Sequence, residues 1–562
     1  MPVPSPSEAR VASIAAWLML AAALLSSAYV RGRYVDMPLE RDEGEFAYSA
    51  RLLLQGEPPY KHAYNIKLPG VDLVYAGFLG AFGDDARSIH VGLLLTGLAT
   101  IVILWRLADD LFDPMTAGAA AWAYAMLSTS PAVVGTAAHA THFIALCTLI
   151  GVTAILRAVA RVSVSATFIA GLAFGTAVLM KQPALIFALL GLGMLLLPSY
   201  SSNEHATPMA GGRRSRGIVV AVYAAGVILP YAILLAWIWW HGVFSLFWEW
   251  TVIRARTWAG KVAIADALSA CWLGTRTAIG PTWPPYAVAA VGLSGLAVTR
   301  RFPLRTRLTV LGFLAVACLA TSAGFFFRRH YFILLLPAVS LCFGAGARIL
   351  ADAVSRLVRP SATSAAISIL GVTLLALGSQ AWLLWPFYGQ WTPGEASRSI
   401  YGPNPFVESP AVGEYLRKHT LPDERIAVLG SEAQILFYAR RTAATGHLFV
   451  YPMMTPGPDG DRAQREMIAE ISRAKPAYIV YVKVATSWLG VPDSSDRLHR
   501  WAEEYIDRFY AIDGVIDIIG PGQTEYVWGD AAAAYAGRSP HQLHVYKRTC
   551  TAADSPSPHA AD

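Results

Sequence analysis

Four carboxylates lie within six residues of the sequence, directly after its first apolar segment. They belong to Glu40, Asp42, Glu43 and Glu45. Ionisable groups at a membrane surface are unfavourable unless they have partners, so such a cluster marks a candidate functional site. Lys67, in the stretch Asn-Ile-Lys-Leu-Pro-Gly of the same loop, can supply the positive charge that a phosphate-bearing substrate requires. The two stretches predict a site that combines carboxylates with a phosphate-binding cation.

The acidic stretch also has a structural interpretation. Glu45 follows Asp42 by three residues, which is the spacing of a capping box. In a capping box the two side chains accept hydrogen bonds from free backbone amides at the start of a helix. The structural and functional roles do not exclude each other, so both stay open at this point.

Two histidines lie at the start of the fourth predicted apolar segment. His139 and His142 are three residues apart, which places them on the same face of a helix. Ligation of a divalent metal is conceivable there, but two histidines without a placed carboxylate are more often the polar lining of a cavity. The sequence therefore leaves the metal undecided and indicates no certain cofactor.

Further cations lie at the outer boundaries of apolar segments. Arg329, His330 and Tyr331 lie between the ninth and tenth segments, and Lys181 lies at the break between the fifth and sixth. Guanidinium groups at an apolar boundary can bind phosphate in bidentate fashion, although snorkelling towards lipid headgroups explains them as well. We expect Arg329, His330 and Tyr331 to bind phosphate and Lys181 to line the same site.

A second basic and aromatic stretch runs from Phe247 to Trp258 and contains Arg254 and Arg256. Its composition suits a segment that lies in the headgroup layer of a membrane. A plain aromatic belt at the membrane boundary is the more common cause of such a stretch. Arg254 and Arg256 are therefore predicted only to line the site.

The composition is that of a multi-span membrane protein. Of 562 residues, 55% are hydrophobic and 15% are charged, and the mean hydropathy is +0.43. Soluble proteins have about 45–50% apolar and about 25% charged residues. The net charge of +7 does not indicate a nucleic-acid partner, because the arginines fall mostly in short loops between apolar runs. The five cysteines form neither a disulfide framework nor a metal-binding pattern.

Apolar runs predict about eleven transmembrane helices in a membrane domain that spans residues 11–390. The predicted helices cover residues 11–30, 89–108, 115–134, 137–156, 162–180, 183–197, 217–240, 285–298, 308–326, 331–347 and 361–385. An N-terminal lead of residues 1–10 precedes them. Residues 31–87 form a first long loop, which we expect to fold against the membrane surface and to carry the catalytic groups, and residues 241–283 form a second.

The distribution of arginines gives the orientation of these helices. Arginines cluster in alternate short loops, which the positive-inside bias assigns to the cytoplasm. Arg31 and Arg33, after the first helix, argue the other way but are outweighed. The sequence therefore predicts a cytoplasmic N terminus, with both long loops and the C-terminal region outside.

Beyond residue 390 the sequence becomes charged and rich in turns. Its patterns predict strands at 425–430, 477–482 and 543–547, and helices at 411–419, 434–440, 462–473 and 498–509. This alternation predicts a small α/β domain over residues 391–548, followed by a disordered tail of residues 549–562. Gly-Ser-Glu at 430–432 lies at a strand-to-helix turn but matches neither a nucleophile elbow nor a phosphate loop. We expect this domain to act as a lid or to bind an acceptor.

Three motifs follow one another in the membrane domain. They are the acidic pair Asp42-Glu43 after the first helix, the Lys-x-Pro stretch Lys67-Leu68-Pro69, and Arg329-His330-Tyr331 ahead of a Leu-rich helix containing Pro337. In these motifs the sequence resembles the GT-C glycosyltransferases, and among them the bacterial relatives of protein O-mannosyltransferases and of lipid A aminoarabinose transferase. The resemblance covers residues 11–385.

The resemblance implies an α-helical polytopic fold and a polyprenyl-phosphate sugar as donor. It also implies a catalytic aspartate at Asp42, with Glu43 beside it, and a phosphate-binding lysine at Lys67. Two departures are present: the usual Lys-Pro-Pro is Lys-Leu-Pro, and an acidic residue often found early in the fourth span is replaced around His139 and His142. These departures leave the acceptor and the metal open.

The residue types fit transfer of a sugar from a lipid phosphate to a hydroxyl. A base must take the acceptor proton and cations must stabilise the departing phosphate, which allows a single inverting displacement with Asp42 as general base. We expect the reaction at the outer face of the plasma (inner) membrane, among membrane lipids, with a glycan, a lipid or a protein as acceptor. The alternatives are a lipid or solute transporter or flippase, which would carry charges in mid-span, and a non-catalytic scaffold.

Overall fold

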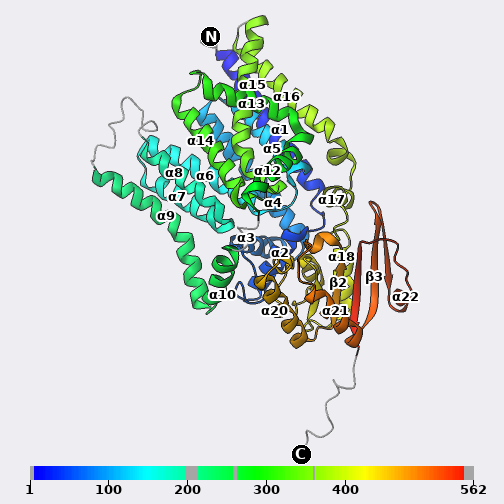
Figure 1. Ribbon diagram of the computed structural model, residues 1–562. Coiled ribbons are helices and arrows are strands. Elements are labelled where there is room, and N and C mark those ends of the chain that lie inside the picture. Colours follow the sequence, from blue (N-terminus) through cyan, green and yellow to red (C-terminus); the bar gives the residue numbers. More distant parts are fainter. Residues whose placement is uncertain (1–5, 198–212, 257–261, 359–360, 550–562) are drawn as a thin grey trace, which may run out of the picture.

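The computed structural model describes residues 6–197, 213–256, 262–358 and 361–549. Within these ranges the chain forms a helical bundle, and a smaller domain that contains a β-sheet packs at one end of it (Figure 1). Most of the predicted tail, residues 550–562, lies outside the described residues.

All eleven predicted apolar segments contain helix within the described residues. The corresponding helices are α1 (Pro6–Arg33), α4 (Ala86–Leu111), α5 (Pro114–Ser128), α6 (Ala140–Arg161), α7 (Val164–Met180), α8 (Leu185–Leu196), α9 (Arg213–Trp240), α13 (Trp283–Val298), α14 (Leu304–Thr321), α15 (Leu336–Val358) and α16 (Ala362–Leu383). In the described part of the chain, seven helical segments are long and apolar enough to cross a membrane. The others, α5, α7, α8 and α13, are shorter. The predicted fold class, a polytopic helical membrane protein with a small C-terminal sheet, is confirmed.

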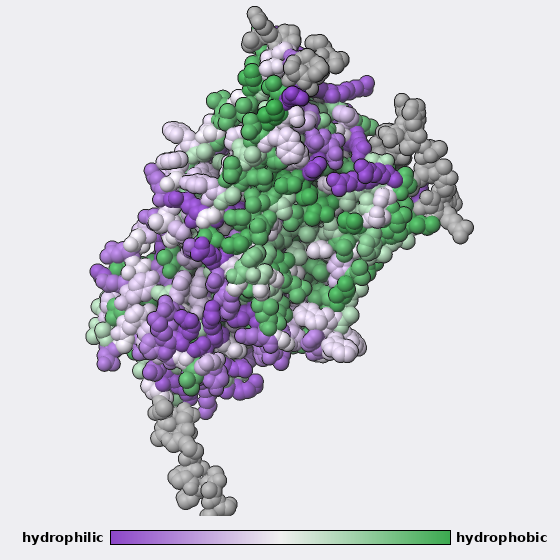
Figure 2. All heavy atoms as spheres, turned by 180° about the vertical axis from the view of Figure 1, so that it is seen from behind, coloured by the Kyte–Doolittle hydropathy of each residue, from purple (hydrophilic) through white to green (hydrophobic). Residues whose placement is uncertain are grey.

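The surface of the molecule agrees with this division. Seen from behind, hydrophobic residues form a broad region over the helical bundle, and hydrophilic residues gather over the C-terminal domain (Figure 2). Large apolar side chains on the bundle surface, such as Leu25, Ile233 and Trp382, are well exposed. Such exposure is unfavourable in water but suits contact with lipid.

Both long loops between the predicted spans contain helices. The first holds α2 (Arg41–Leu54) and α3 (Gly70–Phe82), and the second holds α10 (Phe244–Trp248), the π-helical turn η4 (Glu249–Arg254) and α12 (Ile264–Ile279). Short 3-10 turns also occur between the helices: η1 (Pro131–Val133), η2 (Gln182–Ala184), η5 (Gly280–Thr282), η6 (Ala323–Phe325) and η7 (Arg329–Leu335). Of these, η2, η6 and η7 carry residues that line the cavity. The first loop is therefore folded, as expected.

The C-terminal domain is built on a five-stranded sheet with the strand order β1-β2-β5-β3-β4. Its strands are β1 (Ile426–Leu429), β2 (Tyr478–Lys483), β3 (Tyr510–Gly520), β4 (Gln523–Trp528) and β5 (Gln542–Arg548), of which β1 and β2 are parallel and the other neighbours antiparallel. Its helices are α17 (Pro393–Tyr401), α18 (Ser409–His419), α19 (Ala433–Ala439), α20 (Pro458–Ala474), α21 (Arg497–Phe509) and α22 (Asp530–Ala533); η8 (Pro386–Gln390), η9 (Tyr451–Met454) and η10 (Ala485–Ser487) are shorter turns. The three predicted strands and four predicted helices are present, whereas β3, β4, α17 and α22 were not predicted.

Helix α2 lies between the bundle and the C-terminal domain (Figure 1). A Cβ atom at Gly44 would lie 2.5 Å from Gln434, so only glycine allows α2 to approach α19 this closely. The hydroxyl of Tyr48 accepts a hydrogen bond of 2.9 Å from the backbone N–H of Ala443. These contacts fix the acidic helix against the C-terminal domain.

Candidate active site

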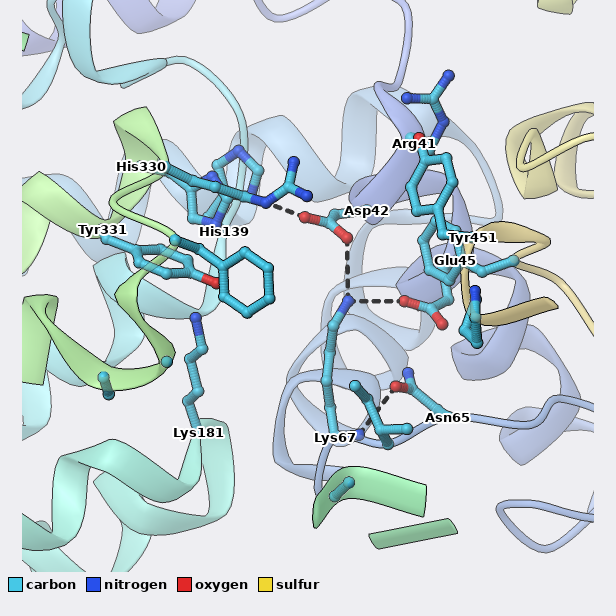
Figure 3. A pocket seen from close by; sticks show the side chains of 18 of the residues that line it. Arg41, Asp42, Glu45, Asn65, Lys67, His139, Lys181, His330, Tyr331 and Tyr451 are labelled. Carbon is cyan, nitrogen blue, oxygen red and sulfur yellow. Dashed lines mark hydrogen bonds and ion pairs between the residues drawn. The ribbon is translucent and has the colours of Figure 1, made fainter. Parts of the chain in front are cut away.

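A cavity of about 980 Å³ lies where the bundle meets the C-terminal domain (Figure 3). Most of the predicted site residues line it, namely Asp42, Glu45, Lys67, His139, Lys181, Arg254, Arg256, Arg329, His330 and Tyr331. Two residues of the prediction, Glu43 and His142, are not among the side chains that line this cavity in the described part of the chain. The fold thus brings together residues that are up to about three hundred positions apart in the sequence.

Lys67 joins two carboxylates of α2 on one wall of the cavity. Its Nζ atom lies 2.9 Å from Oδ1 of Asp42 and 2.8 Å from Oε2 of Glu45 (Figure 3). The Asp42 side chain is 28% exposed, whereas the Glu45 side chain is 1% exposed. Of the two carboxylates, Asp42 is therefore the one that a substrate can reach.

The two carboxylates differ in their affinity for a proton. Burial opposes ionisation of Asp42, but the combined attraction of Lys67, His139 and His330 outweighs it and holds the pKa of Asp42 well below its usual range. At Glu45 burial dominates and raises the pKa to about 7, in spite of Lys67. Oε1 of Glu45 is buried and has no hydrogen-bond partner among the described residues, which agrees with the higher proton affinity.

The capping box of α2 lies two residues earlier than predicted. Glu40 is the N-cap residue, and its side chain accepts a hydrogen bond of 3.0 Å from the backbone N–H of Glu43. The Glu43 side chain in turn accepts one of 3.2 Å from the backbone N–H of Glu40. Asp42 and Glu45 are thereby free to bind Lys67, so their predicted capping role is wrong.

Glu43 faces the bundle instead of the cavity. Its Oε1 atom lies 3.1 Å from Nε2 of His90 on α4 and accepts a hydrogen bond of 2.6 Å from the backbone N–H of Ala138. Ala138 is the neighbour of His139 in the sequence. The buried Glu43 carboxylate therefore holds the chain segment that carries His139, and it does not touch the space where a substrate would lie. Glu43 therefore lies outside the cavity in which it was predicted to act with Asp42.

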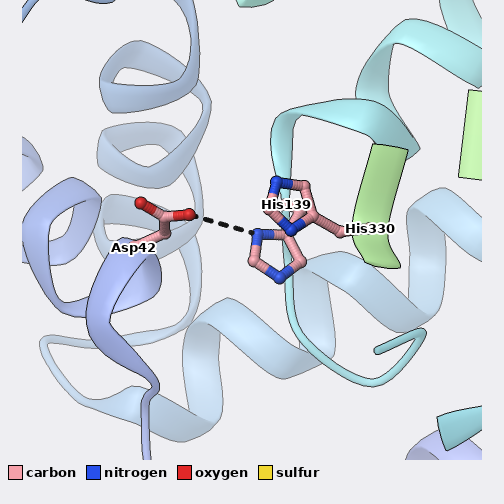
Figure 4. Close-up of side chains that lie close together, drawn as sticks. All are labelled: Asp42, His139 and His330. Atoms are coloured by element: carbon pink, nitrogen blue, oxygen red, sulfur yellow. Dashed lines mark ion pairs between the residues drawn. The ribbon is translucent and has the colours of Figure 1, made fainter. Parts of the chain in front are cut away.

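His139 pairs with His330 and not with His142. The rings of His139 and His330 are stacked, with centroids 4.0 Å apart, and Nδ1 of His139 lies 3.8 Å from Oδ2 of Asp42 (Figure 4). His142, three residues further on, is buried and does not line the cavity. His139 is the N-cap residue of α6 and precedes the regular helix that carries His142, and of the two only His139 lines the cavity.

Asp42, His139 and His330 could together hold a cation. One ligand atom from each lies within 4.8 Å of the others. Burial lowers the pKa of His139, against the attraction of Asp42, so the imidazole is held in the neutral form that binds metals. One carboxylate and two neutral imidazoles form a donor set that suits a divalent transition metal.

The opposite wall of the cavity is basic. Nζ of Lys181 lies 3.5 Å from the centre of the Tyr331 ring, and Arg328 also lines this wall. Arg329 donates from Nε to the carbonyl of Ala132 at 3.0 Å and from Nη1 to that of Ile400 at 3.2 Å. Nη2 of Arg329 donates to the carbonyl of Pro131, so all three nitrogens of the guanidinium are hydrogen-bonded to backbone carbonyls. Arg329 therefore links η1 to α17, and this role suits it better than the predicted binding of phosphate.

Arg254 also has fixed partners. It lies 2.9 Å from Glu249 and 3.0 Å from Glu466 on α20, and its guanidinium lies over the Trp250 ring at 4.5 Å. This arrangement attaches the second loop to the C-terminal domain. Arg254 and Arg256 line the cavity, as predicted for them.

The C-terminal domain supplies cavity residues that sequence reasoning missed. They are Tyr401, Asn404, Phe406, His447, Phe449, Tyr451 and Met453. Most of these residues are single polar or aromatic side chains in short turns, in loops or at the end of a helix, far from the acidic loop in the sequence. No local spacing relates them to it, so only the folded chain reveals them.

Comparison with known proteins gives one family match and several similar structures. Residues 61–212 match a family model described as dolichyl-phosphate-mannose-protein mannosyltransferase. No curated protein matches the chain. Among solved structures, ArnT from Cupriavidus metallidurans bound to undecaprenyl phosphate is 15% identical, with a TM-score of 0.54 over 94% of this chain and 97% of that chain.

Two archaeal structures are similar as well. The oligosaccharyltransferase AglB from Archaeoglobus fulgidus, in complex with an inhibitory peptide and a dolichol-phosphate, is 13% identical with a TM-score of 0.50, covering 92% of this chain and 74% of that chain. An Archaeoglobus fulgidus oligosaccharyltransferase in complex with Zn and sulfate is 13% identical with a TM-score of 0.53, covering 91% and 73%. At these identities the likeness shows the fold, which is that of the GT-C glycosyltransferases. The resemblance predicted from the three motifs is confirmed.

Proposed function

We propose that this protein transfers a sugar from a polyprenyl-phosphate donor to a hydroxyl group of an acceptor. The observation that carries the proposal is the place of Asp42, whose carboxylate faces a large cavity with Lys67 beside it and basic residues across from it. The match to a mannosyltransferase family, and the undecaprenyl phosphate and dolichol-phosphate bound to similar proteins, support this donor class.

Asp42 is the general base of the proposed reaction. It takes the proton of the acceptor hydroxyl while the acceptor oxygen attacks the anomeric carbon of the sugar. The bond from that carbon to the phosphate oxygen breaks, and polyprenyl phosphate leaves with the electron pair. A phosphate leaving group needs no general acid, so a single displacement inverts the anomeric configuration.

Lys67 and Lys181 stabilise the phosphate in this proposal. Charge-assisted hydrogen bonds from ammonium groups suit a phosphate whose negative charge grows as it leaves. Lys67 also restrains Asp42, because their attraction lowers the pKa of that carboxyl. A phosphate that draws Lys67 towards itself would weaken this attraction and make Asp42 a stronger base. His330 and Tyr331 complete the phosphate side.

A divalent cation fits the site formed by Asp42, His139 and His330. The Zn found in a similar oligosaccharyltransferase supports such a site. A bound cation would supply Lewis-acid stabilisation of the donor phosphate. The protein residues themselves orient the carboxylate and bring the phosphate to it.

The proposed reaction takes place at the outer face of the plasma (inner) membrane. The acidic helix and the C-terminal domain lie at the same end of the bundle (Figure 1), and the arginine distribution assigns this end to the outside. Single cysteines in place of Gln55 and Lys418, both exposed, should react with an impermeant reagent in intact cells. A cysteine in place of exposed Arg300 should not. The reverse pattern would contradict this orientation.

Release of free undecaprenyl phosphate tests the transfer itself. Purified protein in lipid nanodiscs is given undecaprenyl-phosphate sugars together with cell-envelope acceptors, and the lipid product is measured by mass spectrometry. We expect release that requires both acceptor and Asp42. Asp36→Asn is the matched control, because Asp36 lies in the same loop, is exposed and does not line the cavity. Movement of intact donor across proteoliposomes without release would favour the flippase alternative.

A further inference from the structure

The turn between β1 and α19 forms part of the cavity surroundings, although it belongs to the C-terminal domain. The carbonyl of Ser431 accepts a hydrogen bond of 2.6 Å from Nε of Arg41, and Glu432 forms an ion pair with Nη2 of Arg41. The hydroxyl of Ser431 accepts one of 3.0 Å from the backbone N–H of Val450. One turn therefore holds both Arg41, next to Asp42, and the segment that carries Tyr451.

Arg41 forms an aromatic and polar wall of the cavity together with residues of the C-terminal domain (Figure 3). Its guanidinium lies 5.4 Å from the centre of the Phe406 ring and 5.3 Å from that of the Tyr451 ring. Its Nη2 atom also donates to Oδ1 of Asn404 at 2.9 Å. The Glu432 side chain is 0% exposed, so its charge acts on Arg41 and not on the solvent. This wall therefore carries no net charge.

The wall across the cavity differs in charge. Lys181 and Arg328 line it, and among the described residues no carboxylate lies within ion-pair distance of either side chain. An unpaired cation attracts phosphate, whereas a guanidinium already paired with a buried carboxylate attracts it much less. The charge difference between these two walls favours an orientation of a lipid-linked sugar phosphate in which the phosphate lies away from Arg41.

We propose that Glu432 is a positioning residue that neutralises and orients Arg41, so that the C-terminal wall receives uncharged sugar hydroxyls and the donor phosphate goes to the opposite wall. The proposal rests on the proposed function, because it assumes a sugar phosphate as substrate. Aromatic rings such as Tyr451 and Phe406 pack on the apolar faces of sugars, and the amide of Asn404 and the guanidinium of Arg41 hydrogen-bond to hydroxyls.

Glu432→Gln tests this role because it keeps the shape of the side chain and removes its charge. Arg41 then becomes an uncompensated cation, and it offers phosphate a second place in the cavity. We expect undecaprenyl phosphate to bind about 3–10-fold more tightly than to the wild type. We expect kcat to fall by about tenfold, because phosphate held near Arg41 places the sugar away from Asp42. Binding is measured by titration in nanodiscs and kcat by release of lipid phosphate.

Glu408→Gln is a matched control in the same domain. Glu408 forms a buried ion pair with Arg398, as Glu432 does with Arg41, but neither Glu408 nor Arg398 lines the cavity. Both variants should lose thermal stability. Only Glu432→Gln should change the affinity for undecaprenyl phosphate and kcat. If the two variants behave alike, Glu432 is structural and the proposal is overturned.

A double variant, Arg41→Gln with Glu432→Gln, removes both charges of the ion pair. It tests the proposal even if the single variant Glu432→Gln fails to fold. Its affinity for undecaprenyl phosphate should return to that of the wild type, while kcat stays reduced because the wall has lost its guanidinium. Wild-type kcat in the double variant would overturn the proposal. Failure of undecaprenyl phosphate to bind the wild type at all would instead refute the proposed donor class, and this outcome is seen without any variant.

Discussion

Asp42 on the cavity side of α2 and Glu43 on its bundle side are neighbours in the sequence but have different surroundings. Asp42 shares Lys67 with Glu45 and is open to the cavity. Glu43 is buried against His90 and the backbone of Ala138. Both carboxylates have partners, so the presence of a partner does not separate a catalytic carboxylate from a structural one. In the proposed reaction, access to a substrate separates them.

Asp42→Asn should have the largest effect on turnover. Asparagine keeps the size of the side chain and can still accept a hydrogen bond from Lys67, but it cannot take a proton. We expect the rate of sugar transfer to fall about a hundredfold or more, with little change in donor binding. The measurement is release of lipid phosphate in nanodiscs. Near-normal transfer by this variant would remove Asp42 as the base.

Lys67→Met should have the next largest effect, and on binding as well as rate. The variant keeps most of the apolar stem but removes the ammonium group that lies between Asp42 and Glu45. We expect affinity for undecaprenyl phosphate to fall about 10–100-fold, which corresponds to about 1.4–2.7 kcal/mol. Unchanged affinity and turnover would show that the lysine serves only the two carboxylates.

Sequence reasoning identified the parts of this site that are local in the chain. The acidic stretch, Lys67 and the apolar runs each carry a signal within a few residues, and the helices they predicted are present. The capping box was misplaced by two residues because Glu40 and Asp42 are both acceptors with a glutamate three positions later. Composition alone does not choose between two such overlapping pairs.

The remaining parts depend on contacts between distant segments. His139 meets His330 across nearly two hundred residues, and Glu432 meets Arg41 across nearly four hundred. Strand β4 was missed because its first three residues are polar and none of its residues is buried, so this edge strand has little apolar signal. In β3 several of the apolar residues are buried, but Asp513, Gly514 and Asp517 interrupt them in the sequence. Strand β3 pairs with both β5 and β4, and sequence periodicity does not show this pairing.

Glu43→Gln should mainly affect stability. The glutamine can accept only through its oxygen, and its amide group would face donors at Glu40 or His90, so one buried donor loses its partner. We expect a loss of about 1–3 kcal/mol in stability, with turnover per folded molecule nearly that of the wild type. Thermal unfolding in detergent and transfer assays below the transition measure the two effects. Loss of turnover without loss of stability would show that Glu43, like Asp42, acts in catalysis.

Glu45→Gln should have the smallest effect, and one that depends on pH. Burial raises the pKa of Glu45 to about 7 in the folded protein, whereas an unfolded glutamate has a pKa near its ordinary value of 4.5. The folded state therefore binds a proton more tightly than the unfolded state. The stabilisation that comes from this tighter proton binding is fully present below the pKa of Glu45 in the unfolded chain. It is lost as the pH rises through the pKa of Glu45 in the folded protein.

Glutamine at position 45 does not titrate, so the difference between variant and wild type reports this loss. We expect the stability of Glu45→Gln relative to the wild type to rise by about 1–3 kcal/mol between about pH 5 and about pH 8. The stability of Asp42→Asn relative to the wild type should fall as the pH rises from about pH 2 to about pH 5. The reason is that the pKa of Asp42 is lowered in the folded protein, so its ionised form stabilises the wild-type fold. Thermal unfolding across this pH range measures both. A pH-independent difference for Glu45→Gln would mean that Glu45 stays ionised beside Lys67, and the two carboxylates that share this lysine would then be equivalent.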